Sequence, residues 1–138
     1  MVSVVFIQKI KEVKKMILIF TGNEQLDKEL NKYIKNSRVV YYTDYILEED
    51  EATILIATIQ NNKYNFKEFM YKVRKKNIRV ILLLENYKVK ELKEALTLGI
   101  YDILFDPFTI NDVVKLTNVP QPFSEVATYI KRILEIKD

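Results

Sequence analysis

The sequence predicts an α/β domain in which helices cover both faces of a parallel five-stranded sheet. Five short apolar runs recur at fairly even spacing, and helical patterns fill the intervals between them. Three of the runs, MILIF, TILIATI and RVILLL, are continuously apolar. Such runs are typical of parallel strands that are buried on both faces. Strands that alternate with helices in this way predict a three-layer sandwich with right-handed crossovers.

The predicted strands suit one strand order. They cover Met16 to Phe20, Val39 to Tyr42, Thr53 to Ile59, Arg79 to Leu84 and Asp102 to Phe105. Five parallel strands of this length fit the flavodoxin-like order 2-1-3-4-5. A binding site in such a sheet lies at the carboxyl ends of the strands, beside the switch point between the first and third strands.

The first two crossovers differ in helical signal. Asn23 can cap a helix after the first strand. The buried stripe of this helix is predicted to consist of Leu26, Leu30, Tyr33 and Ile34. The second crossover, Thr43 to Glu51, offers few apolar residues before an acidic run. It therefore predicts a short or irregular helix.

The next two crossovers carry clear helical patterns. Asn65, with Glu68 three residues later, resembles a capping box. The stripe that follows consists of Phe66, Phe69, Met70 and Val73. A further stripe consists of Val89, Leu92, Ala95 and Leu96. Gly99 suits the left-handed position that ends this helix.

Two segments fall outside the α/β domain, which is predicted to span residues 16–117. Residues 1–15 form an N-terminal extension with apolar residues at roughly helical spacing. Residues 118–138 begin with a linker that contains two prolines. Ser124 then caps a predicted helix whose apolar side consists of Val126, Ile130, Ile133 and Leu134. This helix either completes the sandwich or leads toward a partner.

Composition excludes several classes of chemistry. The chain has no Cys and no His, which removes disulfides, thiolate nucleophiles, ordinary zinc sites and His-based catalysis. Its only glycines, Gly22 and Gly99, cannot build the phosphate-binding loops of nucleotide-binding proteins. The net charge of +3 comes from scattered Lys and Arg, which weighs against a nucleic-acid partner. Without a bilayer-length apolar run or a signal peptide, we expect a cytoplasmic protein.

The stretch EALTLGIYDILFDPF, Glu94 to Phe108, resembles the receiver domains of response regulators. Receivers commonly read EAL, two variable residues and GA, followed by DYL and KPF. The strand rhythm extends the resemblance over roughly Met16 to Thr117. It implies a CheY-like fold and a cis peptide bond between Asp106 and Pro107.

The resemblance also implies that phosphoryl chemistry has been lost. Receivers hold Mg²⁺ with an acidic pair after the first strand, and these positions fall on Thr21 and Gly22. The phosphorylated aspartate ends the third strand, where this chain has Ala57 or Thr58. Neither side chain can form an aspartyl phosphate.

Three further positions also lack the residue that receivers use there. The hydroxyl residue at the end of the fourth strand corresponds to Leu84, and the aromatic switch of the fifth strand corresponds to Ile103. The lysine that neutralises phosphate corresponds to Asp106, which reverses the charge. The chain is therefore identified as a degenerate receiver domain, a pseudo-receiver with no enzyme activity, metal or cofactor.

Without this chemistry, the resemblance implies a regulatory domain that works by protein contact or dimerisation. The expected face combines the helix around Val89 to Leu96 with the strand Asp102 to Phe105. Similar domains precede MinD/ParA-type ATPases, which makes a P-loop ATPase an expected partner. The alternative is a ligand-sensing or enzymatic flavodoxin-like domain that uses a crevice formed by Thr21, Asn23, Thr58 and Asp106. In the simplest interpretation, these four residues only cap helices and satisfy loops.

Other polar groups allow two interpretations each. Asp44 and Glu85 either complete a cation site on the rim of the crevice or stabilise a turn and remain solvated. The basic cluster Lys72, Arg74, Lys75 and Lys76 either contacts phosphate or complements the dipole of its helix. The dipole interpretation is favoured. The nine tyrosines include candidates for a protein-binding patch.

Overall fold

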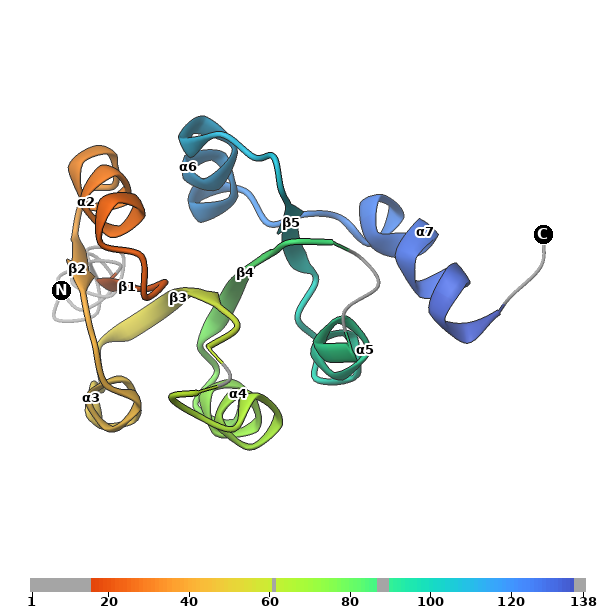
Figure 1. Cartoon of the computed structure of the whole chain (residues 1–138), viewed down its shortest axis with the longest axis horizontal. Coiled ribbons are helices and arrows are strands. Elements are labelled where there is room, and N and C mark those ends of the chain that lie inside the picture. Colours follow the sequence, from red (N-terminus) through yellow and green to blue (C-terminus); the bar gives the residue numbers. More distant parts are fainter. Residues whose placement is uncertain (1–15, 61, 87–89, 136–138) are drawn as a thin grey trace, which may run out of the picture.

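A computed structural model describes residues 16–60, 62–86 and 90–135 of the chain (Figure 1). The predicted extension, residues 1–15, lies outside the described residues, as does Val89. The strands are β1 Met16–Phe20, β2 Ser37–Val39, β3 Ala52–Thr58, β4 Arg79–Leu84 and β5 Asp102–Phe105. They form one sheet in the order β2-β1-β3-β4-β5. All neighbouring pairs are parallel, which confirms the predicted fold.

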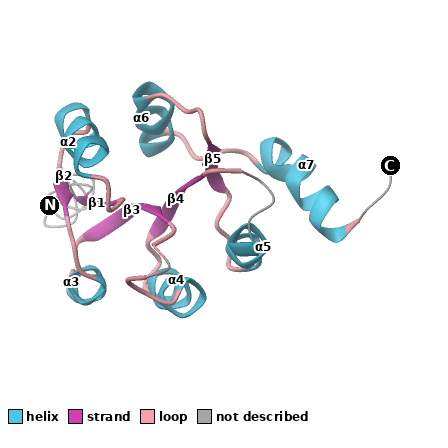
Figure 2. Cartoon of the chain, viewed as in Figure 1, coloured by secondary structure: helices cyan, strands magenta, loops and turns pink. Residues whose placement is uncertain are grey.

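Six described helices accompany the sheet. They are α2 Glu24–Tyr33, α3 Thr43–Glu48, α4 Phe66–Lys75, α5 Lys90–Thr97, α6 Ile110–Asn118 and α7 Phe123–Leu134. Figures 1 and 2 show α2 and α6 on one face of the sheet and α3, α4 and α5 on the other. The last helix, α7, lies beyond β5 at the edge of the sheet. The short α3 confirms the weak helical signal of the second crossover.

The continuously apolar strands supply both faces of the core. Along β1, Leu18 and Phe20 belong to the cluster under α3, α4 and α5, whereas Ile17 and Ile19 belong to the cluster under α2 and α6. All four side chains are at most 4% exposed. Because successive side chains of a strand point to opposite faces, a strand covered on both sides has no polar positions.

The second strand differs from its prediction. The apolar pattern predicted Val39 to Tyr42, but β2 covers Ser37–Val39 and pairs with Ile17, Leu18 and Ile19 of β1. Tyr41 and Tyr42 follow the strand and are 61% and 74% exposed. Hydrogen bonding to β1, rather than apolar content, therefore sets the ends of this edge strand.

The helix ends largely follow the sequence signals. The Asn23 side chain accepts a hydrogen bond from the Leu26 backbone at 3.1 Å, and Asn65 accepts one from Glu68 at 2.9 Å. Gly99 has φ +76°, as its position after α5 predicted. A capping box that was not predicted joins Thr109 and Asp112 at the start of α6.

Two helix predictions are wrong. Ser124 does not cap the last helix, because α7 begins one residue earlier, at Phe123, directly after Pro122. Tyr33 was placed on the buried stripe of α2 but is 59% exposed. It is the last residue of the helix, and its ring lies 5.4 Å from the ammonium group of Lys32. At that end of the predicted stripe, Leu30 and Ile34 are buried and Tyr33 is not.

A buried ion pair fastens the amino-terminal ends of β4 and β5. The Asp102 carboxylate lies 2.7 Å from Nε of Arg79, and its other oxygen accepts a hydrogen bond from the Gln121 backbone at 2.6 Å. The Arg79 guanidinium also donates to the carbonyl oxygen of Leu116 at the end of α6. Asp102 is only 5% exposed, so it depends on these partners to offset its lost hydration.

We expect Asp102→Ala to lower the free energy of unfolding by about 2 to 3 kcal/mol, because it leaves a partly buried guanidinium unpaired. Urea unfolding followed by circular dichroism measures this change. Asp50→Ala removes an exposed carboxylate of the same type and should change the value by less than about 0.5 kcal/mol. Equal unfolding midpoints for the two variants would show that the ion pair does not stabilise the fold.

Candidate functional site at the strand ends

A crevice of about 460 Å³ opens at the carboxyl ends of the strands. It is lined by Thr21, Asn23, Leu26, Thr58, Ile59, Leu83, Leu84, Glu85, Glu91, Asp106 and Phe108. The four polar residues predicted to converge at the switch point, Thr21, Asn23, Thr58 and Asp106, all lie on it. Because the carboxyl ends of parallel strands share one edge of the sheet, the topology alone brings them together.

Hydrogen bonds occupy the two threonine hydroxyls of the crevice. Oγ1 of Thr21 donates to Oδ1 of Asp27 at 2.5 Å and accepts from the Asn23 backbone at 3.1 Å. Oγ1 of Thr58 donates to the carbonyl oxygen of Thr21 at 2.6 Å. These bonds tie the end of β1 to α2 and β3. The geometry agrees with the simplest interpretation of Thr21 and Thr58, in which they satisfy local structure.

Gly22 forms a tight turn directly after Thr21. Its φ of +73° lies in the left-handed region, which glycine adopts without the strain that other residues incur. A Cβ atom at this position would lie 2.7 Å from Oε1 and 2.9 Å from Cδ of Gln60. The Gln60 side chain is held there by a hydrogen bond from Nε2 to the carbonyl oxygen of Phe20 at 3.2 Å. The turn is therefore fitted to glycine.

The remaining predicted positions divide between core and surface. Ala57 and Ile103 are buried in the cluster under α3, α4 and α5 and do not line the crevice. Leu84 is 3% exposed and contributes to both the core and the crevice. The peptide bond between Asp106 and Pro107 is cis, as predicted. Of the two candidates at the end of β3, only Thr58 lines the crevice.

The charges around the crevice are acidic. Glu85, Glu91 and Asp106 contribute three carboxylates, and among the residues that the structure describes its lining includes no Lys or Arg. A phosphoryl group at this place would be repelled by these charges rather than neutralised. The sequence identified Asp106 and Glu85, whereas the contribution of Glu91 depends on how α5 is placed over the strand ends and was missed.

The structure separates the two carboxylates that could have rebuilt a cation site. Glu85 lies on the crevice, but Asp44 lines a different hollow with Phe20, Tyr41, Tyr42, Thr43 and Lys63. Over the described part of the chain, no three acidic side chains are arranged to hold a metal ion. Of the two interpretations of Asp44, the one that places it on the rim of the crevice does not agree with the structure.

Asp27 is a buried carboxylate that the sequence analysis did not identify. It is 3% exposed and lies on the inner side of α2. Burial raises the pKa of this carboxyl above its usual range, although hydrogen bonds from Thr21 and the charge of Lys63 oppose the shift. Its position three residues after Glu24 on a charged helix gave no signal that it points inward.

The basic cluster at the end of α4 contacts backbone carbonyl groups. Arg74 donates from Nε to Leu98 at 3.1 Å and from Nη1 to Ile78 at 2.9 Å. Nζ of Lys76 donates to the carbonyl oxygens of Leu47 in α3 and, at 3.3 Å, of Glu49. Arg74 and Lys76 thus complement the carboxyl-terminal ends of α5 and α3, whereas the favoured interpretation concerned the dipole of their own helix, α4.

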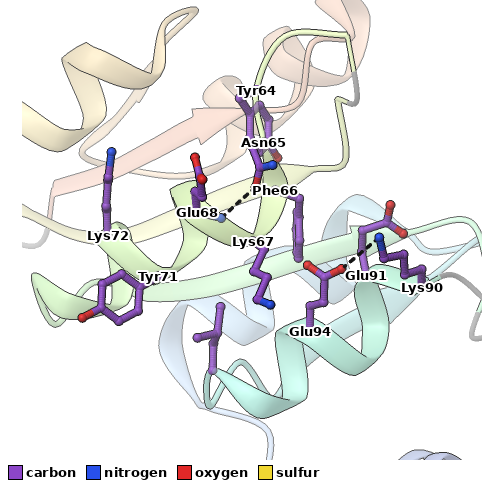
Figure 3. A pocket seen from close by; sticks show the side chains of 11 residues that line it. Tyr64, Asn65, Phe66, Lys67, Glu68, Tyr71, Lys72, Lys90, Glu91 and Glu94 are labelled. Carbon is purple, nitrogen blue, oxygen red and sulfur yellow. Dashed lines mark hydrogen bonds and ion pairs between the residues drawn. The ribbon is translucent and has the colours of Figure 1, made fainter.

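A larger hollow of about 860 Å³ lies between α4 and α5 (Figure 3). Both acidic and basic side chains line it, and Lys90 and Glu94 form an ion pair across one turn of α5 at 3.9 Å. Tyr64 also lines the hollow and donates from its hydroxyl to the carbonyl oxygen of Thr58 at 2.6 Å. The charges of both signs leave no preference for an anionic or cationic ligand.

Comparison with known proteins places the chain by its fold. No protein-family profile and no curated protein sequence matches it. A response regulator receiver protein from Pseudomonas putida superposes with a TM-score of 0.65 at 15% identity, over 76% of this chain and 96% of that chain. A structure described as adenylate cyclase from Rhodopirellula baltica gives 0.66 at 16% identity, over 90% and 99%.

A pilus assembly protein, cpaE, from Burkholderia thailandensis is also similar, with a TM-score of 0.57 at 15% identity over 83% of this chain and 99% of that chain. Identities this low show the fold alone. The chain has the receiver-type, CheY-like fold, as the stretch Glu94 to Phe108 implied. Within the described residues, no helix has the length and apolar character needed to cross a membrane.

The raised pKa of Asp27 predicts a pH dependence of stability. The native chain binds this proton more tightly than the unfolded chain, so the contribution of Asp27 falls as pH rises from about 3.8 through the raised pKa. Asp27→Asn keeps an oxygen that can accept the Thr21 hydrogen bond but does not titrate. Urea unfolding between pH 3 and pH 7 should therefore show the variant gaining stability relative to the native chain as pH rises.

Asp112→Asn is the matched control with the opposite sign. Hydrogen bonds from the Thr109 backbone and side chain hold the pKa of Asp112 below its usual value. Its stabilising contribution is present above the unfolded pKa and lost as pH falls. The Asp112 variant should lose stability relative to the native chain as pH rises. If the stability of the native chain and of Asp27→Asn changed with pH in the same way, the raised pKa of Asp27 would be contradicted.

Proposed function

We propose that this chain is a non-catalytic regulatory domain of receiver-type fold that works through protein–protein contact. The observation that carries the proposal is the chemistry of the crevice at the strand ends. In place of a cation-binding acidic pair, an acceptor carboxylate and a lysine, it presents Thr21, Thr58, Leu84 and Asp106. Three carboxylates line it, and none of its described lining residues is basic.

The geometry supports treating these positions as a degenerate phosphorylation site. A covalent phosphoryl acceptor needs a free nucleophile, but the hydroxyl of Thr58 donates a hydrogen bond to the carbonyl oxygen of Thr21. The hydrogen bonds described for Thr58 include none to a carboxylate that could act as a base. A magnesium ion needs several oxygen ligands after β1, where Gly22 has no side-chain oxygen and Asp27 is turned toward Thr21. Ala57 and Ile103 are core residues.

The proposed contact face combines α5 and β5. On the outer surface of α5, Lys90, Lys93 and Thr97 are exposed. A second copy of the chain is the first partner to test, because closed symmetric dimers are the commonest assemblies of soluble proteins. A P-loop ATPase of the MinD/ParA type is the second, and follows from the resemblance described above.

The acidic crevice favours a second candidate function, that of a small-ligand sensor. Its volume of about 460 Å³ lies within the range of ligand pockets, and apolar side chains such as Leu26 and Phe108 accompany the three carboxylates. Those charges suit an organic amine better than a phosphorylated ligand. The hydrogen bonds that already occupy Thr21 and Thr58 make this the weaker candidate.

We expect acetyl phosphate with Mg²⁺ to leave the intact mass and the melting temperature of the chain unchanged. A stable phosphoryl adduct on any residue of the crevice would overturn the proposal.

Melting with organic amines such as spermidine tests the second candidate function, the small-ligand sensor. A ligand at a hundred times its dissociation constant should stabilise the native state by about 2.7 kcal/mol. Glu85→Gln should then abolish the shift, because it removes one of the carboxylates.

We expect Lys93→Glu to weaken self-association at least tenfold, equivalent to about 1.4 kcal/mol, because it reverses an exposed charge of α5 in the proposed face. Sedimentation equilibrium measures the dissociation constant. Lys35→Glu, which makes the same charge change at the opposite edge of the sheet, should leave the constant unchanged. Equal effects of the two variants would show that association depends on net charge and not on this face.

A further inference from the structure

A groove lies between α2 and α6, which contact each other on one face of the sheet (Figure 1). It consists of two hollows of about 330 and 640 Å³, which adjoin because Tyr33 and Val114 line both. The other apolar residues of this α2–α6 groove are Ile17, Ile34 and Ile110. Two helices and the first strand thus present apolar side chains to one opening.

The apolar side chains of the groove are unevenly covered. Tyr33 is 59% exposed, although the stripe predicted for α2 buries its neighbours Leu30 and Ile34. Across the groove, Ile110 and Val114 lie about one turn apart on α6 and are only partly buried. Contiguous apolar surface of this kind marks a place where another segment or molecule docks.

The chain enters the sheet beside this groove. Ile17, the second residue of β1, lines it, and the Ile17 backbone N–H donates to the carbonyl oxygen of Asn36 at 3.0 Å. Asn36 lines the same hollow. The residues that precede Met16 are therefore attached to the chain next to the groove, and they need no long connection to reach it.

The fifteen residues before Met16 suit an apolar groove. Phe6, Ile10 and Val13 follow the spacing of one helix face. At 1.5 Å per residue, a helix of this length spans about 22 Å, against about 14 Å for the nine residues of α6. The segment is long enough to follow the groove even when the residues next to Met16 form a turn. Polar residues occupy the positions between the apolar ones, namely Gln8, Lys9, Lys11 and Glu12.

We propose that residues 1–15 dock through this apolar face in the α2–α6 groove of their own chain. The docked segment covers the exposed ring of Tyr33 and adds a third element to the layer of α2 and α6. Attachment to β1 gives the segment an effective concentration of the order of millimolar, an advantage that a second copy of the chain lacks. The inference is independent of the proposed contact face, because α5 lies on the other face of the sheet (Figure 1).

The first test locates the segment in the full-length chain. Gln8→Cys introduces a single cysteine, because the native chain has none, and a nitroxide label is attached to it. In dilute solution, the label should broaden the amide NMR signals of Tyr33, Ile110 and Val114. The signal of Tyr71, which is 57% exposed on α4 at the other face of the sheet, should stay sharp. Equal broadening at all four positions, or none, would overturn the proposal.

Two controls identify what occupies the groove. The same label in a chain that also carries Phe6→Asp and Ile10→Asp should no longer broaden the groove signals, because charges replace the apolar contacts. In a mixture of labelled chain with isotope-enriched chain that has no label, broadening reports contact between copies. Broadening of the groove signals in that mixture would assign the groove to a second copy and overturn the proposal. Binding of the label to phosphatidylglycerol vesicles, with the groove signals sharp, would assign the segment to a membrane surface and overturn it as well.

A double-mutant cycle provides an independent measurement. Tyr33→Ser should lower the urea midpoint of the native chain, and it should lower the midpoint less in a chain that carries Phe6→Ser, because the contact is already lost. Tyr71→Ser, a matched change of an equally exposed tyrosine, should shift the midpoint by the same amount in both chains. Additive effects of Phe6→Ser and Tyr33→Ser would contradict docking of the segment against Tyr33.

Discussion

The buried carboxylate of Asp102 is the constraint on which one end of this molecule depends. An ionised group that is 5% exposed is tolerated only with close partners, and here they come from two places in the chain. Arg79 binds it from β4 and reaches on to the last turn of α6, while the Gln121 backbone binds it from the linker. The sheet edge, α6 and the start of α7 are therefore positioned by one charge.

The opposite end of the sheet is fastened in a comparable way. Thr21, Asp27 and Thr58 form a chain of hydrogen bonds from α2 across β1 to β3. The raised pKa of Asp27 shows that burial outweighs these bonds for the charged form. Polar groups at a switch point are usually available to a ligand, but most of those present here are engaged in joining secondary structure elements. The hydroxyls have partners, and the charged residues that the structure describes on the rim are acidic.

Sequence patterns predicted the sheet well because its apolar runs are continuous and the crossovers are short. The convergence of Thr21, Asn23, Thr58 and Asp106 also followed, since topology decides which strand ends meet. The errors arose where distant partners decide the outcome. Pairing with β1 places β2 earlier in the chain than its apolar residues predicted. Tyr33 is exposed because α2 ends at this residue. Asp102 and Asp27 were missed because the residues that compensate them lie 23 and 6 positions away in sequence; an acidic residue at the start of an apolar strand was the only available sign.

The turn at Gly22 bears on how this crevice can change over evolutionary time. A residue with a side chain there must accept a left-handed backbone and also displace the anchored end of Gln60. An aspartate, the residue that could bring a cation to this position, carries both costs from the moment it arises, before any ligand offsets them. Selection for stability alone would remove it. A chain with this turn is thus held away from metal-dependent chemistry by its own packing, and a path back requires position 60 to change first.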